Sequence, residues 1–185
     1  MKITDIKTFL MMAGSPALKQ STSWSKRNWC FVKVYTDEGI TGLGEGSGWP
    51  RVVETAINDL KPIVIGEDPM NIERIWQKML VSTMGAGMTG TPGSGSMNAI
   101  DMALWDIKGK ALNTPVWNLL GGKVRDRIRA YGHAKTPERA LELKERGLTA
   151  VKTGGVHRTV EKVDAIRKAV GDEICLLYTS PSPRD

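Results

Sequence analysis

The 185-residue sequence predicts an α+β domain followed by the beginning of an α/β domain. Residues 1–46 contain stretches in which polar and apolar residues alternate, which is the period of a half-buried strand. Residues 52–112 instead repeat apolar residues at helical spacing. After residue 122, short strand-like runs alternate with helices, a pattern typical of βαβ units and a parallel sheet. We therefore place a domain boundary between residues 122 and 123.

The first domain opens with a predicted antiparallel meander. Residues 2–12 have the pattern of one strand, and residues 28–46 have the pattern of two strands joined at Asp37, Glu38 and Gly39, residue types that suit a tight hairpin turn. Between the first two strands lies AGSPALKQSTSWSKRN, which is too polar to belong to a core. We expect it to form a long loop, and long loops in compact domains are often functional.

Two helices are predicted after the meander, over residues 52–66 and 69–83. The second opens at the start signal Asp68-Pro69 and repeats apolar residues along one face. The glycine-rich segment that follows, residues 84–96, contains a G-x-G-x-x-G pattern, but it comes after a helix. Because a dinucleotide fingerprint must follow a strand, we interpret the segment as a flexible connector.

A third helix is predicted over residues 97–112, with Ser94 or Ser96 as its N-cap. Its apolar stripe comprises Met97, Ile100, Ala103, Leu104, Ile107 and Ala111. Two carboxylates on this helix, Asp101 and Asp106, are five residues apart and point in different directions around the turn. We expect structural roles for both.

In the second domain the predicted order is strand, helix, strand, helix, strand. The strands are DRIRAYGH, LTAVKTGG and EICLL, and the helices are PERALELKERG and RTVEKVDAIRKAVGD. The carboxyl ends of parallel strands meet at one edge of a sheet. Side chains that follow these strands are therefore expected to lie near one another.

Composition limits the classes of function. The net charge of +6 comes from Lys and Arg scattered among Asp and Glu, so nucleic-acid binding is not expected. No apolar run approaches the roughly 18 residues of a membrane helix, and the N-terminus lacks the apolar region of a signal peptide. The two cysteines, Cys30 and Cys175, cannot form a disulfide framework or a zinc site. We therefore expect a cytoplasmic protein that binds no membrane.

The run NAIDMALWDIKGKALNTPVWNLLGG, together with YTDEGITGLGEG, resembles the mandelate racemase and muconate lactonizing enzyme branch of the enolase superfamily. The resemblance extends from Met1 to about residue 174 and is greatest to the sugar-acid dehydratases related to galactonate dehydratase. It implies an α+β capping domain followed by the start of a (β/α)8 TIM-type barrel. It also implies a Mg²⁺-dependent lyase of sugar-acid catabolism, usually a homo-oligomer, that removes the proton next to a carboxylate and eliminates water through an enolate.

By this resemblance, Lys152 is the first candidate catalytic residue. It ends the second barrel strand and matches the first lysine of the family's Lys-x-Lys motif, whereas Gly154 stands at the second position. That departure counts against racemization by a lysine base and fits the dehydratases. His133 ends the first strand and is the second catalytic candidate. The alternatives are an ordinary lysine at a strand end and a histidine that caps a loop.

Four further residues are candidate contacts of a sugar-acid substrate. His157 follows the second barrel strand, and three others occupy the two capping-domain loops that close over the substrate in the family: Lys19, Trp49 and Arg51. Their donors suit the hydroxyls and the carboxylate of a sugar acid.

No metal ligand is predicted within the chain. In relatives the third barrel strand runs into Asp-x-Asn, whose Asp binds the metal, but here it runs into Tyr178 and Thr179. Residues 175–185, CLLYTSPSPRD, match the translation of a transposase sequencing adapter beginning TGT CTC TTA TAC ACA TCT. We expect them to be non-biological, the parent to continue into a barrel of about 250 residues, and this piece alone to be inactive. Two alternatives remain open: a racemase, epimerase or cycloisomerase of the same superfamily, or a non-catalytic ligand-binding module.

Overall fold

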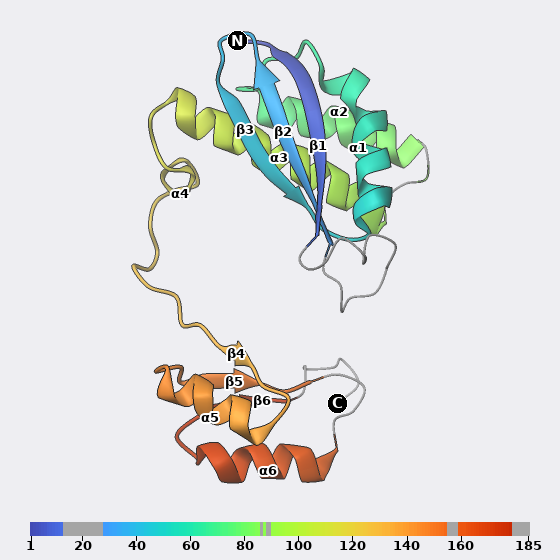
Figure 1. Cartoon of the computed structure of the whole chain (residues 1–185). Coiled ribbons are helices and arrows are strands. Elements are labelled where there is room, and N and C mark those ends of the chain that lie inside the picture. Colours follow the sequence, from blue (N-terminus) through green and yellow to red (C-terminus); the bar gives the residue numbers. More distant parts are fainter. Residues whose placement is uncertain (13–27, 86, 88–89, 155–158, 179–185) are drawn as a thin grey trace. The chain divides into compact units, whose positions relative to one another are not determined.

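The computed structural model describes residues 1–12, 28–85, 87, 90–154 and 159–178. The chain forms two compact units, Met1–Lys123 and Val124–Asp185 (Figure 1). The first unit contains an antiparallel sheet covered by helices, and the second contains a parallel sheet with helices between its strands. This order confirms the predicted fold class.

The first unit is built on a three-stranded sheet in the order β1-β2-β3. Its strands are β1 (Ile3–Met12), β2 (Asn28–Thr36) and β3 (Thr41–Gly46), and every neighbouring pair is antiparallel. One face carries Ile6, Val32 and Val34, all buried against the helices. The helices are α1 (Pro50–Val64), α2 (Ile72–Gly85), α3 (Thr91–Ala111) and the short α4 (Val116–Leu119).

Helix α3 lies directly on the backbone of β3. A Cβ atom added to Gly42 would lie 1.9 Å from the Ala103 carbonyl oxygen, and one added to Gly44 would lie 1.9 Å from that of Ala99. At these two positions only glycine fits, because any side chain would overlap the helix backbone. The two glycines therefore set how closely helix and strand approach.

The glycine-rich segment is partly helical, so the predicted flexible connector is wrong for residues 84–85, which end α2, and for residues 91–96, which begin α3. Helix α3 begins at Thr91, with Gly90 as N-cap and Pro92 in its first turn. Ser96 is buried inside the helix and donates a hydrogen bond to Gly93 O, so the predicted Ser94 or Ser96 cap is also wrong. Packing overrides helix propensity here, because a Cβ at Gly95 would lie 2.2 Å from Ser47 O. The predicted apolar stripe is buried except for Ala111, which is exposed at the end of the helix.

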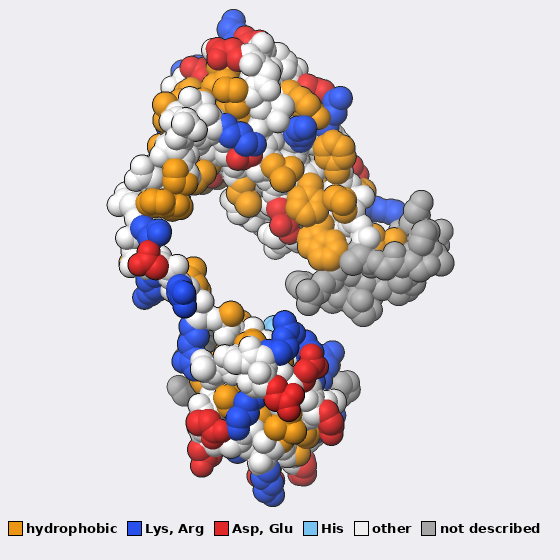
Figure 2. Space-filling model, turned by 60° about the vertical axis from the view of Figure 1, so that its left-hand side comes forward, with side chains coloured by type: hydrophobic (Ala, Val, Ile, Leu, Met, Phe, Trp, Pro, Cys, Tyr) orange, Lys and Arg blue, Asp and Glu red, His pale blue; other side chains and the backbone are white. Residues whose placement is uncertain are grey.

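The other face of the sheet is open and partly apolar in the described part of the chain. Cross-strand neighbours on this face include Phe9 with Phe31 and Met11 with Trp29. Phe9 is 43% exposed and Met11 56% exposed. Figure 2 shows hydrophobic side chains gathered on one side of this unit.

Side chains of the helices satisfy polar groups at the rim of the sheet. At the free edge of β3, Asp106 Oδ2 accepts a hydrogen bond from the Leu43 N–H at 2.9 Å. Lys110 Nζ donates to Thr41 O at 2.8 Å and to Asp106 Oδ2 at 2.6 Å. Asp106 thus has the structural role expected from its position on the helix, since it blocks an edge at which another strand could pair.

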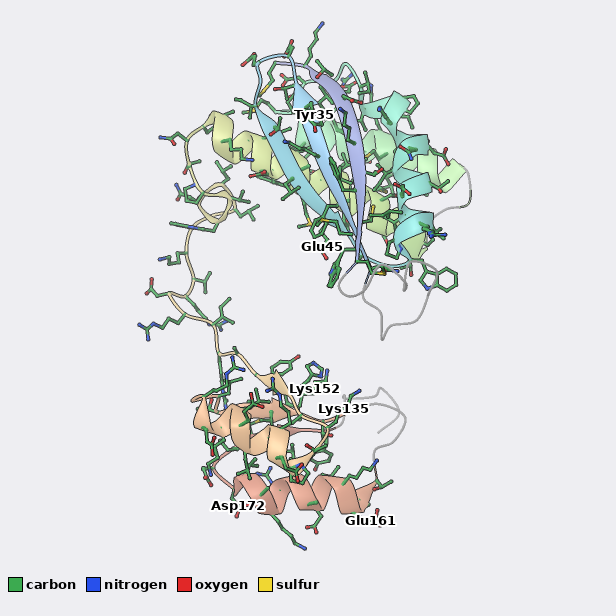
Figure 3. The ribbon with its side chains drawn as sticks, viewed as in Figure 1. Tyr35, Glu45, Lys135, Lys152, Glu161 and Asp172 are labelled. Carbon is green, nitrogen blue, oxygen red and sulfur yellow. The ribbon has the colours of Figure 1, made fainter. Side chains whose placement is uncertain are left out.

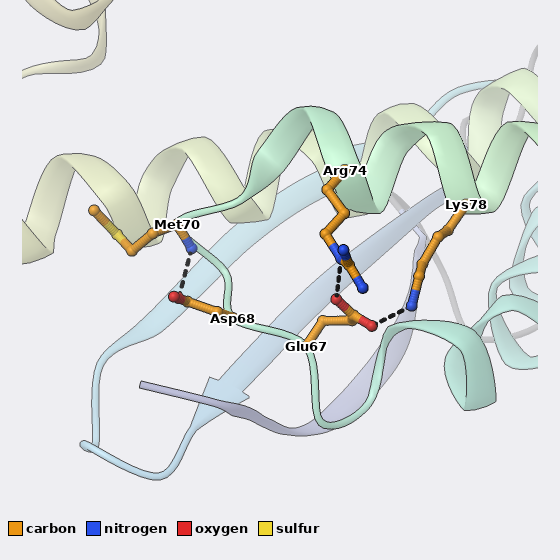
Figure 4. Close-up of polar contacts among 5 residues, drawn as sticks. All are labelled: Glu67, Asp68, Met70, Arg74 and Lys78. Atoms are coloured by element: carbon orange, nitrogen blue, oxygen red, sulfur yellow. Dashed lines mark hydrogen bonds and ion pairs between the residues drawn. The ribbon is translucent and has the colours of Figure 1, made fainter.

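A second polar cluster fixes the turn between α1 and α2. Glu67 forms ion pairs with Arg74, at 3.2 Å, and with Lys78, both from α2 (Figure 4). Asp68 Oδ1 accepts a hydrogen bond from the Met70 N–H at 3.0 Å, which orders the Asp68-Pro69 start signal. The carboxylates therefore orient the chain as it enters α2.

The second unit is a parallel sheet in the order β4-β5-β6. The strands are β4 (Gly132–His133), β5 (Ala150–Lys152) and β6 (Cys175–Leu177), with α5 (Pro137–Glu145) and α6 (Val160–Val170) between them. Each helix begins at a threonine N-cap, Thr136 or Thr159. Their apolar residues enclose a small core that includes Leu143, Val151 and Ile166.

In this unit the structure contradicts one sequence prediction and leaves another untested. Residues 126–131 were expected to be strand, but they form none, and β4 begins only at Gly132. A strand at the edge of a sheet needs a partner along its length, and β5 pairs only with Gly132 and His133. Residues 175–177 form β6, and the non-biological origin of residues 175–185 stays a prediction.

Candidate functional site at the carboxyl ends of the parallel strands

His133 and Lys152 lie side by side at the carboxyl ends of β4 and β5. They are register partners in the parallel ladder, as are Gly132 and Val151 one residue earlier. Val151 is fully buried among the helix residues, and a Cβ on Gly132 would lie 2.6 Å from the Leu143 side chain. Since side chains alternate along a strand, His133 and Lys152 occupy the opposite face, away from the helices. Figure 3 shows Lys152 on the side of the strands away from α6.

Tyr131 joins these two residues, although the sequence analysis did not select it. The Lys152 Nζ atom lies 5.9 Å from the centroid of the Tyr131 ring, within the range of a cation–π contact. The Tyr131 and His133 rings are 6.0 Å apart between centroids and tilted by 48°. The two-residue period of a strand could have identified it, because Tyr131 and His133 flank Gly132.

Chemically, this cluster suits an anion that carries hydroxyl groups. An ammonium group donates strong hydrogen bonds to a carboxylate, and an imidazole can donate to or accept from a hydroxyl. Lys152 is half-buried, and both Tyr131 and His133 are exposed to solvent. The three side chains are therefore accessible to a ligand, and the position of the Lys152 ammonium group is partly fixed.

The described residues hold no cluster of three or more metal-ligating His, Cys, Asp or Glu side chains. At the end of β6, Leu177 and Tyr178 contribute no carboxylate. Asp101 points in a different direction from Asp106 and is half-buried. Burial raises the pKa of its carboxyl, and the negative charge of Glu73 raises it further. A hydrogen bond from Trp105 opposes this rise.

Neither of the two cysteines forms part of this cluster. Burial raises the pKa of the Cys30 thiol to about 11, so it is protonated at neutral pH and unsuited to nucleophilic attack. Cys175 is exposed at the start of β6 rather than at its carboxyl end.

The capping-domain candidates belong to the first unit. Trp49 is the N-cap of α1 and is 69% exposed, and its carbonyl accepts a hydrogen bond from Val53 N–H at 2.9 Å. Arg51, also exposed, lies in the first turn of α1. Lys19 and His157 lie outside the described residues. Two open surface depressions, of about 360 and 720 Å³, are lined by first-unit residues and by none of the predicted site residues.

The architecture and the cluster together define a class of protein. An α+β capping unit precedes parallel β/α strands whose carboxyl ends carry polar side chains, which is the plan of the two-domain enzymes of the enolase superfamily. The chain belongs to the mandelate racemase / muconate lactonizing enzyme family, because residues 4–121 match the model of that family's N-terminal domain.

Individual relatives agree with this assignment. A D-galactonate dehydratase from Klebsiella pneumoniae (strain 342) is 49% identical over 113 residues, which are 60% of this chain and 29% of that protein. The 3,6-anhydro-D-galactonate cycloisomerase from Zobellia galactanivorans superposes with a TM-score of 0.85 at 32% identity, over 97% of this chain and 51% of its own. A member of the enolase superfamily from Salmonella Typhimurium gives a TM-score of 0.75 at 32% identity, over 95% of this chain and 53% of its own. The chain thus spans about half the length of these solved relatives.

No helix among the described residues combines the length and the apolar character that crossing a bilayer requires.

Proposed function

We propose that this chain forms the N-terminal half of a Mg²⁺-dependent sugar-acid dehydratase that acts on galactonate or a similar acid. The enzyme removes the proton next to the carboxylate and expels a hydroxyl from the neighbouring carbon, which leaves a 2-oxo-3-deoxy acid. The proposal includes a cytoplasmic location and a homo-oligomeric assembly, and it includes neither nucleic acid nor membrane as a partner.

One observation carries the proposal: Lys152 stands beside His133 at the strand ends while Gly154 replaces the second lysine of the family motif. A racemase that uses Lys-x-Lys needs both lysines on one side of the strand. A dehydratase with its base on another strand needs only the first. The identity to the Klebsiella D-galactonate dehydratase supports the same choice.

The described residues do not form a Mg²⁺ site, since they lack a cluster of carboxylates at the strand ends. The metal, whose role in such chemistry is to stabilise the developing enolate charge, is therefore assigned to residues outside the described ranges. The roles proposed for this chain's own residues are narrower. Lys152 binds and orients the substrate carboxylate through its ammonium, and His133 donates to or accepts from a neighbouring hydroxyl.

Four further residues are proposed as contacts of the sugar acid. Trp49, the N-cap of α1, and Arg51, which lies in the first turn of α1 rather than in the predicted loop, are proposed as contacts from the capping domain. Lys19 and His157 are proposed as further contacts. The exposed Trp49 ring offers an apolar surface for the sugar carbons, and the Arg51 guanidinium suits a hydroxyl or a carboxylate.

The test uses the longer protein that contains this chain, incubated with D-galactonate and Mg²⁺. We expect a 2-oxo-3-deoxy acid in the ¹H NMR spectrum and no product after chelation of the metal. A Lys152→Met variant should lose about 10- to 150-fold in kcat/KM, the value of one hydrogen bond to a charged group. The matched control is Lys162→Met, which removes an exposed lysine of α6 and should leave the rate unchanged. Unaltered kcat/KM in Lys152→Met would refute the assigned role.

A cycloisomerase is the second candidate, because the Zobellia enzyme superposes over nearly the whole chain. Incubation with 3,6-anhydro-D-galactonate, beside the incubation with D-galactonate, separates the two functions. A cycloisomerase converts the anhydro acid into a product of unchanged mass, whereas a dehydratase converts D-galactonate into a product lighter by one water molecule.

A further inference from the structure

Tyr131 contacts both basic residues of the strand-end cluster. Its ring centroid lies 5.9 Å from Lys152 Nζ and 6.0 Å from the centroid of the His133 ring. The aromatic ring therefore contacts both an ammonium group and an imidazole. Among the described residues, the Tyr131 hydroxyl forms no hydrogen bond, so the ring provides these contacts.

Local structure explains why the ring stands there. Gly132 has no side chain, and this leaves room for Leu143 of α5 beneath the strand. The opposite face of the strand carries His133, and Tyr131, just before the strand, lies against it with the two ring centroids 6.0 Å apart. Lys152 reaches the same face from β5, as the register partner of His133.

We propose that Tyr131 is a positioning residue for Lys152. A lysine side chain at a strand end samples many rotamers, and binding a carboxylate would require it to give up that freedom. A ring face under the ammonium restricts the side chain beforehand, at the place where a carboxylate would bind. The inference rests on the proposed function only for the identity of the acid.

A role for the Tyr131 ring and a role for its hydroxyl predict different results. If the ring positions Lys152, then Tyr131→Phe keeps the effect and Tyr131→Leu loses it. An exposed cation–π contact corresponds to about a two- to fivefold difference in binding. A Tyr131→Leu variant should therefore bind a carboxylate about two- to fivefold more weakly than Tyr131→Phe and the parent.

The experiment uses the 185-residue chain with ¹³C-labelled lysine. The Lys152 ε-methylene signal is assigned by its loss in Lys152→Met, and we expect it upfield of the other lysines, because protons above an aromatic ring are shielded. The upfield position should persist in Tyr131→Phe and disappear in Tyr131→Leu. Titration with acetate, a carboxylate without hydroxyls, then measures binding in the parent and both variants. Tyr35→Leu is the matched control, because Tyr35 contacts Lys7 and Lys33 in the first unit.

Each outcome decides the inference. A parent Lys152 signal at the position of ordinary exposed lysines would overturn it, and so would a Tyr131→Phe variant that behaves like Tyr131→Leu. If Tyr131→Leu fails to fold, the parent and Tyr131→Phe still give the shielding test. Absence of D-galactonate turnover in the longer protein would refute the proposed function, but it would leave these readouts, which need neither metal nor turnover, unchanged.

Discussion

Helix α3 packs so closely on β3 that even the substitution of Gly44 by alanine should strongly destabilise the first unit. An alanine Cβ there would lie 1.9 Å from Ala99 O, whereas ordinary van der Waals contact begins at 3.4 Å. The shortfall of 1.5 Å lies between two backbones, so no side-chain rotation can relieve it. Helix and strand must separate, and the buried contacts of Ala99 and Ala103 with the sheet must loosen.

Overpacking of this kind costs typically about 1–3 kcal/mol, and we expect the upper end because the obstructing atom belongs to the backbone. For a unit of this size, about 3 kcal/mol lowers the melting temperature by about 10 °C. Thermal unfolding of Gly44→Ala, followed by far-UV circular dichroism, measures this shift in the 185-residue chain.

The matched control is Gly85→Ala at the end of α2. A Cβ at Gly85 meets no atom within 4 Å, so this variant should be unchanged or more stable by about 0.4–1 kcal/mol. If Gly44→Ala and Gly85→Ala unfold at the same temperature, the reasoning about backbone contact between α3 and β3 is wrong.

Two further predictions concern ionic groups of the first unit. Replacing Asp106 by Ala frees the Leu43 N–H at the sheet edge and should cost about 1 kcal/mol in urea unfolding while increasing light scattering. Replacing Glu67 by Gln should destabilise the unit at pH 7, because the hydrogen bond from Lys78 is the main cause of the lowered pKa of Glu67. A carboxylate with a depressed pKa stabilises the fold above its ordinary value of 4.5, and this contribution is lost as the pH falls through the folded pKa.

Matched controls separate these effects from the loss of a charge. Asp164→Ala removes an exposed ion pair of α6 and should change stability by no more than about 0.5 kcal/mol, without added scattering. Glu145→Gln removes an exposed carboxylate. If Asp106→Ala is as stable as Asp164→Ala and scatters no more light, the edge-blocking role of Asp106 is wrong. If Glu67→Gln is destabilised at pH 3 by as much as at pH 7, the titration argument is wrong.

Sequence periodicity predicted most of the first unit, because its strands and its three longer helices each bury one face. The alternation in residues 28–36 places Cys30, Val32 and Val34 on the core side, as the structure does. The start of α3 was wrong because helix propensity disfavours glycine. A tertiary contact at Gly95, invisible in the sequence, outweighs that preference.

For the candidate site, the sequence indicated which residues end the strands but not which of them meet. His133 and Lys152 were selected separately, and the parallel register brings them together. Tyr131 was not selected, because it lies inside the predicted strand of residues 126–133 and nothing in the sequence shows that its ring meets Lys152. Its ring lies under the Lys152 ammonium group, whereas the position at Gly132 is filled by the Leu143 side chain.

Helix α3 also packs against the backbone that leads from β3 into α1. A Cβ atom at Gly95 would lie 2.2 Å from Ser47 O, and Trp49 O accepts a hydrogen bond from the Val53 N–H. This segment is thus held in place through main-chain atoms, and the exposed Trp49 side chain takes part in neither contact. Substitutions of Trp49 can therefore accumulate while the backbone at the start of α1 keeps its place.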